Sequence, residues 1–215
     1  MTDSEILSHI DHTLLRPTST VQEIDALCSE AAELKTASVC VPPAYVKYIH
    51  GKYPELNICT VIGFPLGYNT TEVKCFEARD AIANGASEID MVINICWVKN
   101  GEFDKVEHEI SELRRVCGSN VLKVIIETCY LTDEEKKTLC GCVTRAGADY
   151  IKTSTGFGTG GATLSDIQLF SRNIGGNVKM KAAGGVKTRE DLEMFLEAGC
   201  DRIGTSSAVR LLKDK

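Results

Sequence analysis

Short apolar runs rich in β-branched residues recur eight times along the chain, and amphipathic stretches separate them. We predict strands at Ile10–Leu15, Ser38–Val41, Ile58–Ile62, Glu88–Asn94, Leu122–Glu127, Tyr150–Thr155, Lys179–Ala183 and Arg202–Thr205. Helices are expected at Thr20–Leu34, Thr71–Asn84, Phe103–Val116, Thr132–Ala146, Leu164–Asn173 and Arg189–Ala198. Strands that alternate with helices form a parallel sheet, and eight is the number that closes a barrel. The pattern therefore predicts an α/β protein with a (β/α)8 TIM barrel, and an open doubly wound sheet is the structural alternative.

Boundary signals agree with this arrangement. Thr132-Asp133-Glu134-Glu135 and Ser165-Asp166 supply N-caps and first-turn acids, and Gly147 and Gly199 lie where C-terminal glycines belong. No Gly-x-Gly-x-x-Gly follows the first strand, which argues against a dinucleotide-binding sheet. With 215 residues and no linker-like stretch, the chain is expected to be a single domain over residues 1–215.

Composition excludes several classes of partner. The net charge of −6, with no compensating basic run, argues against nucleic acid and against an anionic membrane surface. No apolar stretch approaches the ~20 residues of a membrane-spanning helix, and the N-terminal residues lack a signal peptide's basic region, so a cytoplasmic location is expected. The ten cysteines form no Cys-x-x-Cys and have no nearby histidine pairs, so we expect reduced thiols and no metal site.

Residue parity predicts which titratable side chains point into a barrel. In the fourth strand one face is apolar and would meet the helices, whereas the other face contains Asp90 and would line the interior. The same reasoning points Asp11 and Lys152 inward. Lys179 and Lys181 share one parity. Because glycines follow Lys181, we place it at the catalytic upper end of its strand and Lys179 at the solvated lower rim.

Two lysines each lie where a strand runs out into a small-residue loop, Lys152 before Thr153–Gly156 and Lys181 before Ala182–Gly185. A lysine inside a short apolar strand must pair with a counter-charge or lose its proton, and a second cation nearby favours the loss. A neutral amine is a nucleophile for carbonyl carbon. The pair therefore indicates Schiff-base chemistry, and two structural ion pairs are the alternative.

Small residues also follow the last strands, where barrels of this type often bind phosphate. Gly184 and Gly185 follow the seventh strand, and Ser206 and Ser207 follow the eighth and could open a helix. Glycines let backbone N–H groups approach an anion, and a helix N-terminus faces it with positive potential. These loops predict binding of a phosphate group.

Two motifs closely resemble the lysine motifs of the deoxyribose-phosphate aldolase family: Ile151-Lys152-Thr153-Ser154-Thr155-Gly156 and Lys181-Ala182-Ala183-Gly184-Gly185-Val186. Further segments resemble the family's first, second, fourth and fifth strands, namely Asp11–Leu15, Ser38–Val41, Glu88–Asn94 and Lys123–Thr128. The resemblance spans nearly the whole chain in order. It implies a class I aldolase that reversibly cleaves 2-deoxy-D-ribose 5-phosphate to acetaldehyde and D-glyceraldehyde 3-phosphate.

The resemblance also implies roles for particular residues. Lys152 would be the Schiff-base nucleophile, Lys181 the neighbouring cation, Asp90 a carboxylate for proton transfer through water, and Asp11 a member of the same relay. Substrate or phosphate contacts are expected from Thr13, Cys40, Thr155, Gly156, Gly184, Gly185, Val186, Gly204, Ser206 and Ser207. No cofactor is implied. The expected partners are a small sugar phosphate and a second copy of the chain in a homo-oligomer, with a dimer as the expected state.

Some points stay open at this stage. Glu127 is expected either to orient the site or to form a structural ion pair, and Cys40 is either aldehyde-reactive, as in some relatives, or a plain buried thiol. Phe157 stands where some family members carry a lysine, which leaves the phosphate to backbone groups, serines and Lys187. The rival functions are another Schiff-base sugar-phosphate aldolase, a transaldolase-like barrel, and a catalytically silent barrel that binds sugar phosphate.

Overall fold

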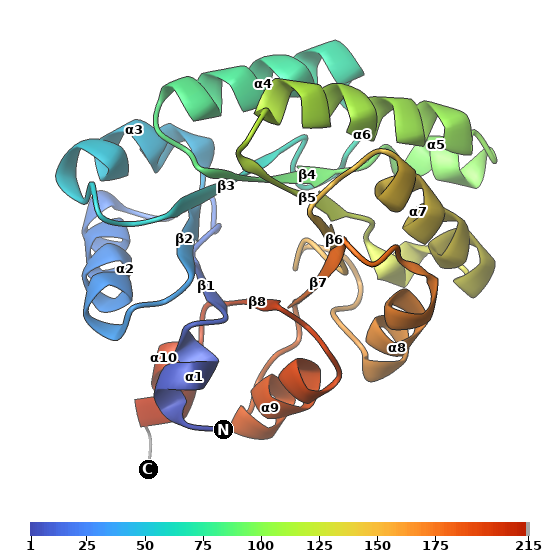
Figure 1. Cartoon of the computed structure of the whole chain (residues 1–215). Helices are drawn as coiled ribbons and strands as arrows, with labels where there is room; N and C mark the ends of the chain where they lie inside the picture. The colour runs from blue at the N-terminus through green and yellow to red at the C-terminus, as the bar shows by residue number, and fades with distance from the viewer. Residues whose placement is uncertain (214–215) are drawn as a thin grey trace.

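Eight parallel strands form a closed ring in the computed structural model, which describes residues 1–213 (Figure 1). Each strand pairs with the next along the chain, and the last pairs with the first. The predicted (β/α)8 barrel is confirmed, and the open sheet is excluded. The strands are β1 (Ile10–Thr13), β2 (Ser38–Val41), β3 (Ile58–Ile62), β4 (Glu88–Val92), β5 (Val121–Ile125), β6 (Tyr150–Lys152), β7 (Lys179–Ala183) and β8 (Arg202–Thr205). Of the predicted domain over residues 1–215, positions 214 and 215 lie outside the described residues.

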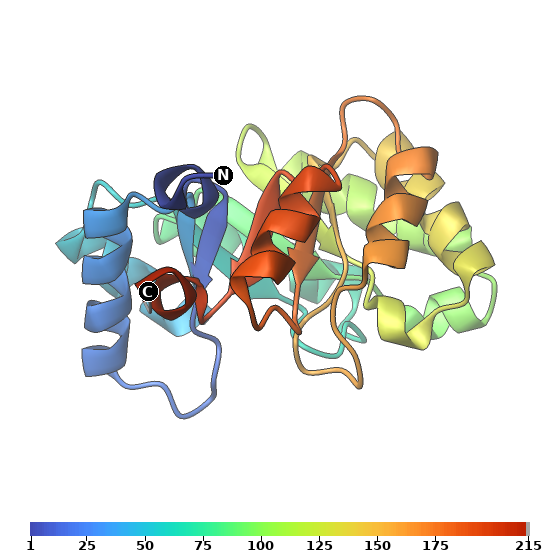
Figure 2. The ribbon, with the colours of Figure 1, turned by 90° about the horizontal axis from the view of Figure 1, so that it is seen from below.

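Helices surround this ring, and the view from below shows them flanking the strands (Figure 2). Those that follow strands are α2 (Val21–Leu34), α3 (Pro43–Lys52), α4 (Thr71–Ala83), α6 (Phe103–Cys117), α7 (Asp133–Arg145), α8 (Leu164–Asn173), α9 (Arg189–Glu197) and α10 (Ala208–Lys213). Shorter segments are α1 (Asp3–Leu7), α5 (Ile95–Lys99) and the 3-10 turn η1 (Thr128–Tyr130). No helix within residues 1–213 combines the length and the apolar character needed to cross a membrane.

The ends of several elements follow the sequence signals, with corrections. Thr132 caps α7 through a capping box, and Gly147 and Gly199 follow their helices with positive φ values, as predicted. The prediction that Ser165-Asp166 caps α8 is wrong. Thr163 is the N-cap, and its hydroxyl accepts a hydrogen bond from the Asp166 N–H.

The strands β1, β4 and β6 are shorter than predicted. The β-branched pattern of β6 continues beyond Lys152, but the following residues bond to neighbouring loops and leave the strand. The Thr153 hydroxyl donates to the Ala183 carbonyl at 3.2 Å, and the Thr155 N–H donates to Glu127. The pattern predicts no helix between β2 and β3, yet α3 begins at Pro43. Proline is tolerated at a first helical position because its missing N–H would have no partner there.

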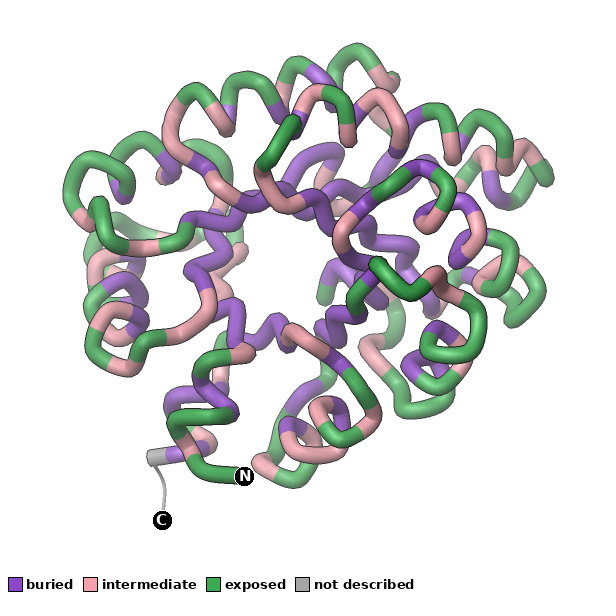
Figure 3. The backbone as a smooth tube through the Cα atoms, viewed as in Figure 1, coloured by how far each residue is buried: buried purple, intermediate pink, exposed green. Residues whose placement is uncertain are grey.

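Apolar side chains fill the space between the ring and the helices, so that the strands are buried and the outer helix faces are exposed (Figure 3). Ile89, Met91 and Ile93 of β4 and its extension belong to this layer, which confirms the predicted parity. Asp90 therefore points the other way, into the barrel. The core packs the strands rigidly, and this fixes where the inward side chains meet.

A buried ion pair outside the ring anchors the upper end of β4. Lys74 of α4 and Glu109 of α6 are fully buried, and the Lys74 ammonium donates both to Glu109 Oε1 and to the Val92 carbonyl at 2.8 Å. Glu109 Oε2 accepts from the Asn94 N–H at 3.2 Å. Removing one partner of a buried pair costs about 3–5 kcal/mol, because the other charge is left uncompensated. The two helices thereby hold the strand that carries Asp90.

Candidate active site

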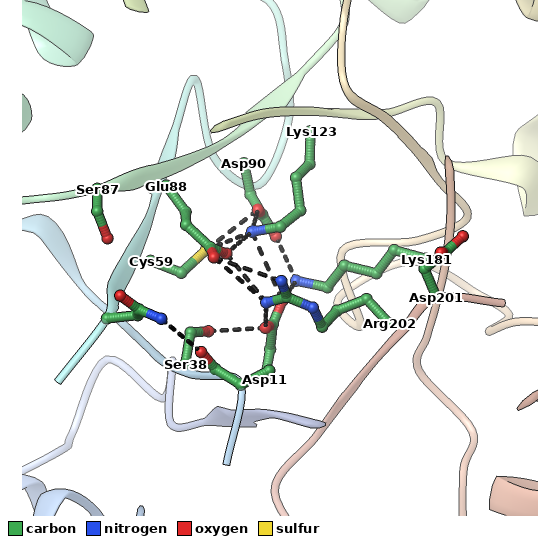
Figure 4. A network of polar contacts seen from close by, with 12 residues as sticks. Asp11, Ser38, Cys59, Ser87, Glu88, Asp90, Lys123, Lys181, Asp201 and Arg202 are labelled. Atoms are coloured by element: carbon green, nitrogen blue, oxygen red, sulfur yellow. Dashed lines mark hydrogen bonds and ion pairs between the residues drawn. The ribbon is translucent and has the colours of Figure 1, made fainter. Parts of the chain in front are cut away.

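Charged side chains from six strands converge inside the barrel (Figure 4). They are Asp11, Glu88, Asp90, Lys123, Lys152, Lys181 and Arg202, which we call the interior cluster. Strand pairing brings them together, since Asp90 lies opposite Lys123 in β4–β5 and Lys152 lies opposite Lys181 in β6–β7. The structure thus joins the four predicted catalytic residues in one network.

Asp90 is the centre of the interior cluster. Its Oδ2 lies 2.7 Å from the ammonium nitrogen of Lys152 and 2.7 Å from that of Lys181, and its Oδ1 lies 2.9 Å from that of Lys123. Burial by itself would raise the pKa of Asp90. The three lysines outweigh this effect and hold that pKa well below its ordinary value. Asp90 is therefore an ionised carboxylate that can accept a proton from a neighbouring group.

Asp11 holds Lys181 from the other side. Its Oδ2 lies 2.5 Å from the Lys181 ammonium, and its Oδ1 accepts from the Ser38 hydroxyl at 2.7 Å. Burial would lower the pKa of Lys181, but the carboxylates of Asp11 and Asp90 raise it above its ordinary value. Lys181 is therefore a permanent cation with no exposed surface.

The lower part of the cluster contains residues that the motifs do not identify. Lys123 lies 2.5 Å from Glu88 Oε2, and Arg202 pairs with both Glu88 and Asp11. Lys123 also donates to Cys59 Sγ at 3.2 Å. Parity was the available signal for Glu88, because it shares the inward face of Asp90 on β4. Lys123 and Arg202 carry no local signature, because their partners lie on other strands.

A cavity of about 430 Å³ opens above the cluster at the carboxyl ends of β1, β6, β7 and β8. Lys152 lines it, whereas Asp11, Asp90 and Lys181 are fully buried beneath. Nine of the predicted substrate contacts line this cavity: Thr13, Thr155, Gly156, Gly184, Gly185, Val186, Gly204, Ser206 and Ser207. Their contacts with substrate remain predictions, but the structure places them around one space.

Arg16 is a cavity residue that sequence reasoning missed. It follows β1 and lines the cavity, and its guanidinium pairs with Glu23 at 2.6 Å. The charged side chains that line the cavity, among the described residues, are Arg16 and Lys152, and both are cationic. The cavity is therefore suited to an anionic ligand. The position of Arg16 directly after a strand end was the available signal.

Glycines shape the floor of this cavity. Gly184 and Gly185 both have φ +77°, and Gly156 has φ +86°, conformations that other residues rarely adopt. A Cβ on Gly161 would lie 2.5 Å from the carbonyl carbon and oxygen of Gly184. The loop after β6 therefore packs backbone to backbone against the loop after β7, which leaves room for an anion beside their N–H groups.

Glu127 ends β5's extension and holds the loop after β6. Its carboxylate accepts from the Thr155 N–H at 3.2 Å and also from the Thr155 hydroxyl. Burial raises the pKa of Glu127, although these hydrogen bonds oppose the shift. Of the two predicted roles, the contacts with Thr155 support orientation of the site.

Cys40 is the one predicted substrate contact that does not line the cavity. It is fully buried and packs with Cys59 and Val61, against Leu15 and Phe64. Two other placements agree with parity. His12 faces outward and contacts Glu30 at 3.0 Å, and Lys179 is exposed at the lower rim.

This arrangement of a lysine pair beneath a glycine-rich anion site also appears in known proteins. The model of the family described as DeoC/LacD family aldolase matches residues 6–211. The chain belongs to this family. A protein of Clostridium botulinum (strain Eklund 17B / Type B) named deoxyribose-phosphate aldolase is 62% identical over 214 residues, 99% of this chain and 97% of the relative. One with the same name from Clostridioides difficile (strain 630) is 56% identical over 214 residues, 98% of this chain and 96% of the relative.

Solved structures agree with the fold and the family. The crystal structure of a protein from Coccidioides immitis, described as a putative deoxyribose-phosphate aldolase, has a TM-score of 0.95 at 37% identity, covering 100% of this chain and 87% of that one. Deoxyribose phosphate aldolase from Aeropyrum pernix, described as a unique tetrameric structure, has a TM-score of 0.92 at 33% identity, covering 99% and 91% of the two chains. The family assignment that the two lysine motifs predicted is confirmed.

Proposed function

We propose that the protein is a class I aldolase that reversibly cleaves 2-deoxy-D-ribose 5-phosphate into acetaldehyde and D-glyceraldehyde 3-phosphate. The observation that carries this proposal is that Lys152 lines the cavity while Asp90 and Lys181 lie directly beneath it. A nucleophilic amine, a carboxylate and a fixed cation are thereby within reach of one bound carbonyl group. The names of the relatives support the choice of substrate.

The charge count of the interior cluster explains why Lys152 can act as a nucleophile. The cluster contains four cations, Lys123, Lys152, Lys181 and Arg202, but only three carboxylates. Neighbouring carboxylates raise the pKa values of Lys181 and Lys123 against the effect of burial. Loss of one proton makes the cluster neutral, and Lys152 is the member that reaches the cavity and has its ion pair with Asp90 alone. Its amine is therefore the group that becomes free to attack.

The reaction then follows from this geometry. The Lys152 amine attacks C1 of the open-chain sugar, and loss of water gives an iminium ion. The iminium accepts the electron pair of the C2–C3 bond, which breaks as the C3 hydroxyl loses its proton, and glyceraldehyde 3-phosphate leaves. The resulting enamine is protonated at C2, and hydrolysis releases acetaldehyde and the free amine. Asp90 moves protons through water, and Lys181 keeps the charge of the site fixed.

The phosphate is proposed to bind at the far side of the cavity. Gly184 and Gly185 expose backbone N–H groups, Ser206 and Ser207 offer hydroxyls, and Arg16 adds a cation. Hydrogen bonds to a charged group contribute roughly 1.5–3 kcal/mol each, so several of them can replace the lysine that Phe157 displaces. Binding energy from this remote group can be used to position the reacting carbons.

A coupled assay of aldehyde release tests this function. We expect cleavage of 2-deoxyribose 5-phosphate, with a kcat/KM at least about 100-fold higher than that of unphosphorylated 2-deoxyribose, because two or more phosphate contacts are lost. Gly185→Val should remove most of this difference, since a β-branched residue is strained at φ +77°. Phe157→Ala is the control and should preserve it.

The same assay separates the rival functions. Activity should survive a chelator, because the iminium supplies the electron sink and no metal is needed. Activity that disappears with a chelator and returns with a divalent ion would contradict the proposal. Preference for a ketone donor would favour a transaldolase-like or other ketose-phosphate reaction. A protein that binds the sugar phosphate but releases no aldehyde would be a silent binding barrel.

We also propose that the chain forms a homodimer. Exposed apolar side chains gather on α4 and on the loop before it, namely Leu66, Tyr68, Val73 and Phe76. An exposed apolar patch of this kind marks a surface that another protein covers, and the relative from Aeropyrum pernix is described as tetrameric. Sedimentation velocity should show a dimer that Phe76→Glu dissociates. A monomeric parent chain would contradict this proposal.

A cytoplasmic location is proposed from the chemistry of the cysteines. All ten are free thiols, and most are buried. Burial raises the pKa values of Cys28, Cys140 and Cys200 to about 12, so these thiols are unreactive. Free thiols in this number are typical of a reducing compartment. Cell fractionation that recovered the protein from an oxidising compartment would contradict this.

A further inference from the structure

A second cavity of about 380 Å³ lies beside the substrate cavity, and we call it the annex. It opens at the carboxyl ends of β1, β2 and β3, which are neighbours in the ring (Figure 1). Leu15 and Phe157 line both cavities, so their side chains form the wall between them. The annex and the substrate cavity are therefore parts of one mouth of the barrel.

The wall is lightly held on its Phe157 side. The Phe157 ring packs edge to face on Phe64, with the centroids 5.3 Å apart and the planes at 86°, and about half of Phe157 is exposed. Its backbone N–H donates to the Thr155 hydroxyl at 3.0 Å, so the loop keeps its position independently of the ring. Truncating this ring should open the wall without changing the loop.

The two cavities differ in charge. The described charged residues of the substrate cavity are the cations Arg16 and Lys152, whereas the annex has the carboxylate of Glu77, which accepts from the Gly63 N–H at 2.8 Å. The rest of the annex lining is aliphatic, aromatic or proline, such as Val61 and Pro43. A phosphate is repelled there, and an apolar chain is favoured.

We propose that the annex binds the apolar chain of an unphosphorylated acceptor aldehyde, and that Phe157 controls entry to it. The inference rests on the proposed function, run in the direction of synthesis. The enamine that acetaldehyde forms on Lys152 attacks the carbonyl carbon of the acceptor, and one C–C bond forms. The carbonyl oxygen takes a proton, and water then hydrolyses the iminium to release a 3-hydroxyaldehyde and the free amine. Benzene occupies a cavity of only about 150 Å³, so the annex has ample room for an alkyl chain.

A series of acceptors tests the proposal with acetaldehyde as the donor. We would measure kcat/KM for butanal, hexanal and octanal and normalise each value to that for glyceraldehyde 3-phosphate in the same variant. Each methylene that enters an apolar cavity favours binding by about fourfold. The normalised value should therefore rise on the order of tenfold from butanal to hexanal. Phe157→Ala should keep this rise and increase the normalised value for hexanal.

Two variants probe the annex itself. Val61→Phe fills the annex and should flatten the chain-length series. Pro43→Asp places a charge at its exposed rim and should do the same, which keeps the test available if Val61→Phe does not fold. Phe76→Ala, an exposed aromatic that lines neither cavity, is the matched control and should leave the series unchanged.

The outcomes separate this proposal from the proposed function. A parent chain that does not cleave 2-deoxyribose 5-phosphate contradicts the function itself. In an active chain, a series that is flat in both the parent and Phe157→Ala overturns the annex, and so does a rise that Val61→Phe and Pro43→Asp leave intact. A rise that appears only in Phe157→Ala supports the annex and shows that the ring closes it.

Discussion

Lys152→Arg is expected to lower kcat/KM for 2-deoxyribose 5-phosphate by at least about 10⁴-fold, because a guanidinium stays protonated and cannot form the iminium. The charge that pairs with Asp90 at 2.7 Å is kept, so the barrel should remain folded. Thermal unfolding followed by circular dichroism checks the fold. Coupled-assay kinetics measure the loss of activity.

Covalent trapping gives the same prediction a direct readout. Borohydride added with acetaldehyde should attach an ethyl group to Lys152 of the parent chain and to no residue of Lys152→Arg, as mapped by peptide mass spectrometry. Lys179→Arg is the matched control, because Lys179 lies at the exposed lower rim of the neighbouring strand. Label on Lys181 or Lys123 of the parent would show that another amine is the nucleophile.

Lys181→Leu is expected to move the acidic limb of the pH–rate profile to higher pH by about one to two units. The substitution leaves three cations and three carboxylates in the interior cluster, so Lys152 becomes the principal counter-ion of Asp90 and keeps its proton to higher pH. Each unit is a tenfold loss below the limb, and kcat/KM at pH 7 should fall about 10- to 100-fold. Part of the activity should return at higher pH, where Lys152 has lost its proton.

Two comparisons keep this second prediction sharp. Lys179→Leu removes a lysine of the same strand and parity outside the cluster, and it should leave the profile unchanged. The Lys152 adduct should still be trapped in Lys181→Leu at high pH. An equal loss of rate at every pH would mean instead that Lys181 acts in substrate binding or proton transfer.

Local sequence patterns determined the barrel and the direction of its key side chains. Strand residues alternate between two faces, so the apolar set of β4 identified the outer face and directed Asp90 inward, and the same period placed Lys152 and Asp11. Glycines after Lys181 distinguished it from Lys179, which the structure confirms. These inferences needed only neighbours in sequence.

The tertiary structure alone decided which charges meet and which side chains reach the cavity. Lys123 and Arg202 join the cluster because their partners lie on other strands, a relation that sequence spacing does not contain. Cys40 lies on an inward face, yet it packs with Cys59 and does not line the cavity. The annex likewise forms where loops from four strands meet around Phe157. Alternation fixes a residue's face, but closure of the ring fixes its neighbours, and the chemistry of the site depends on both.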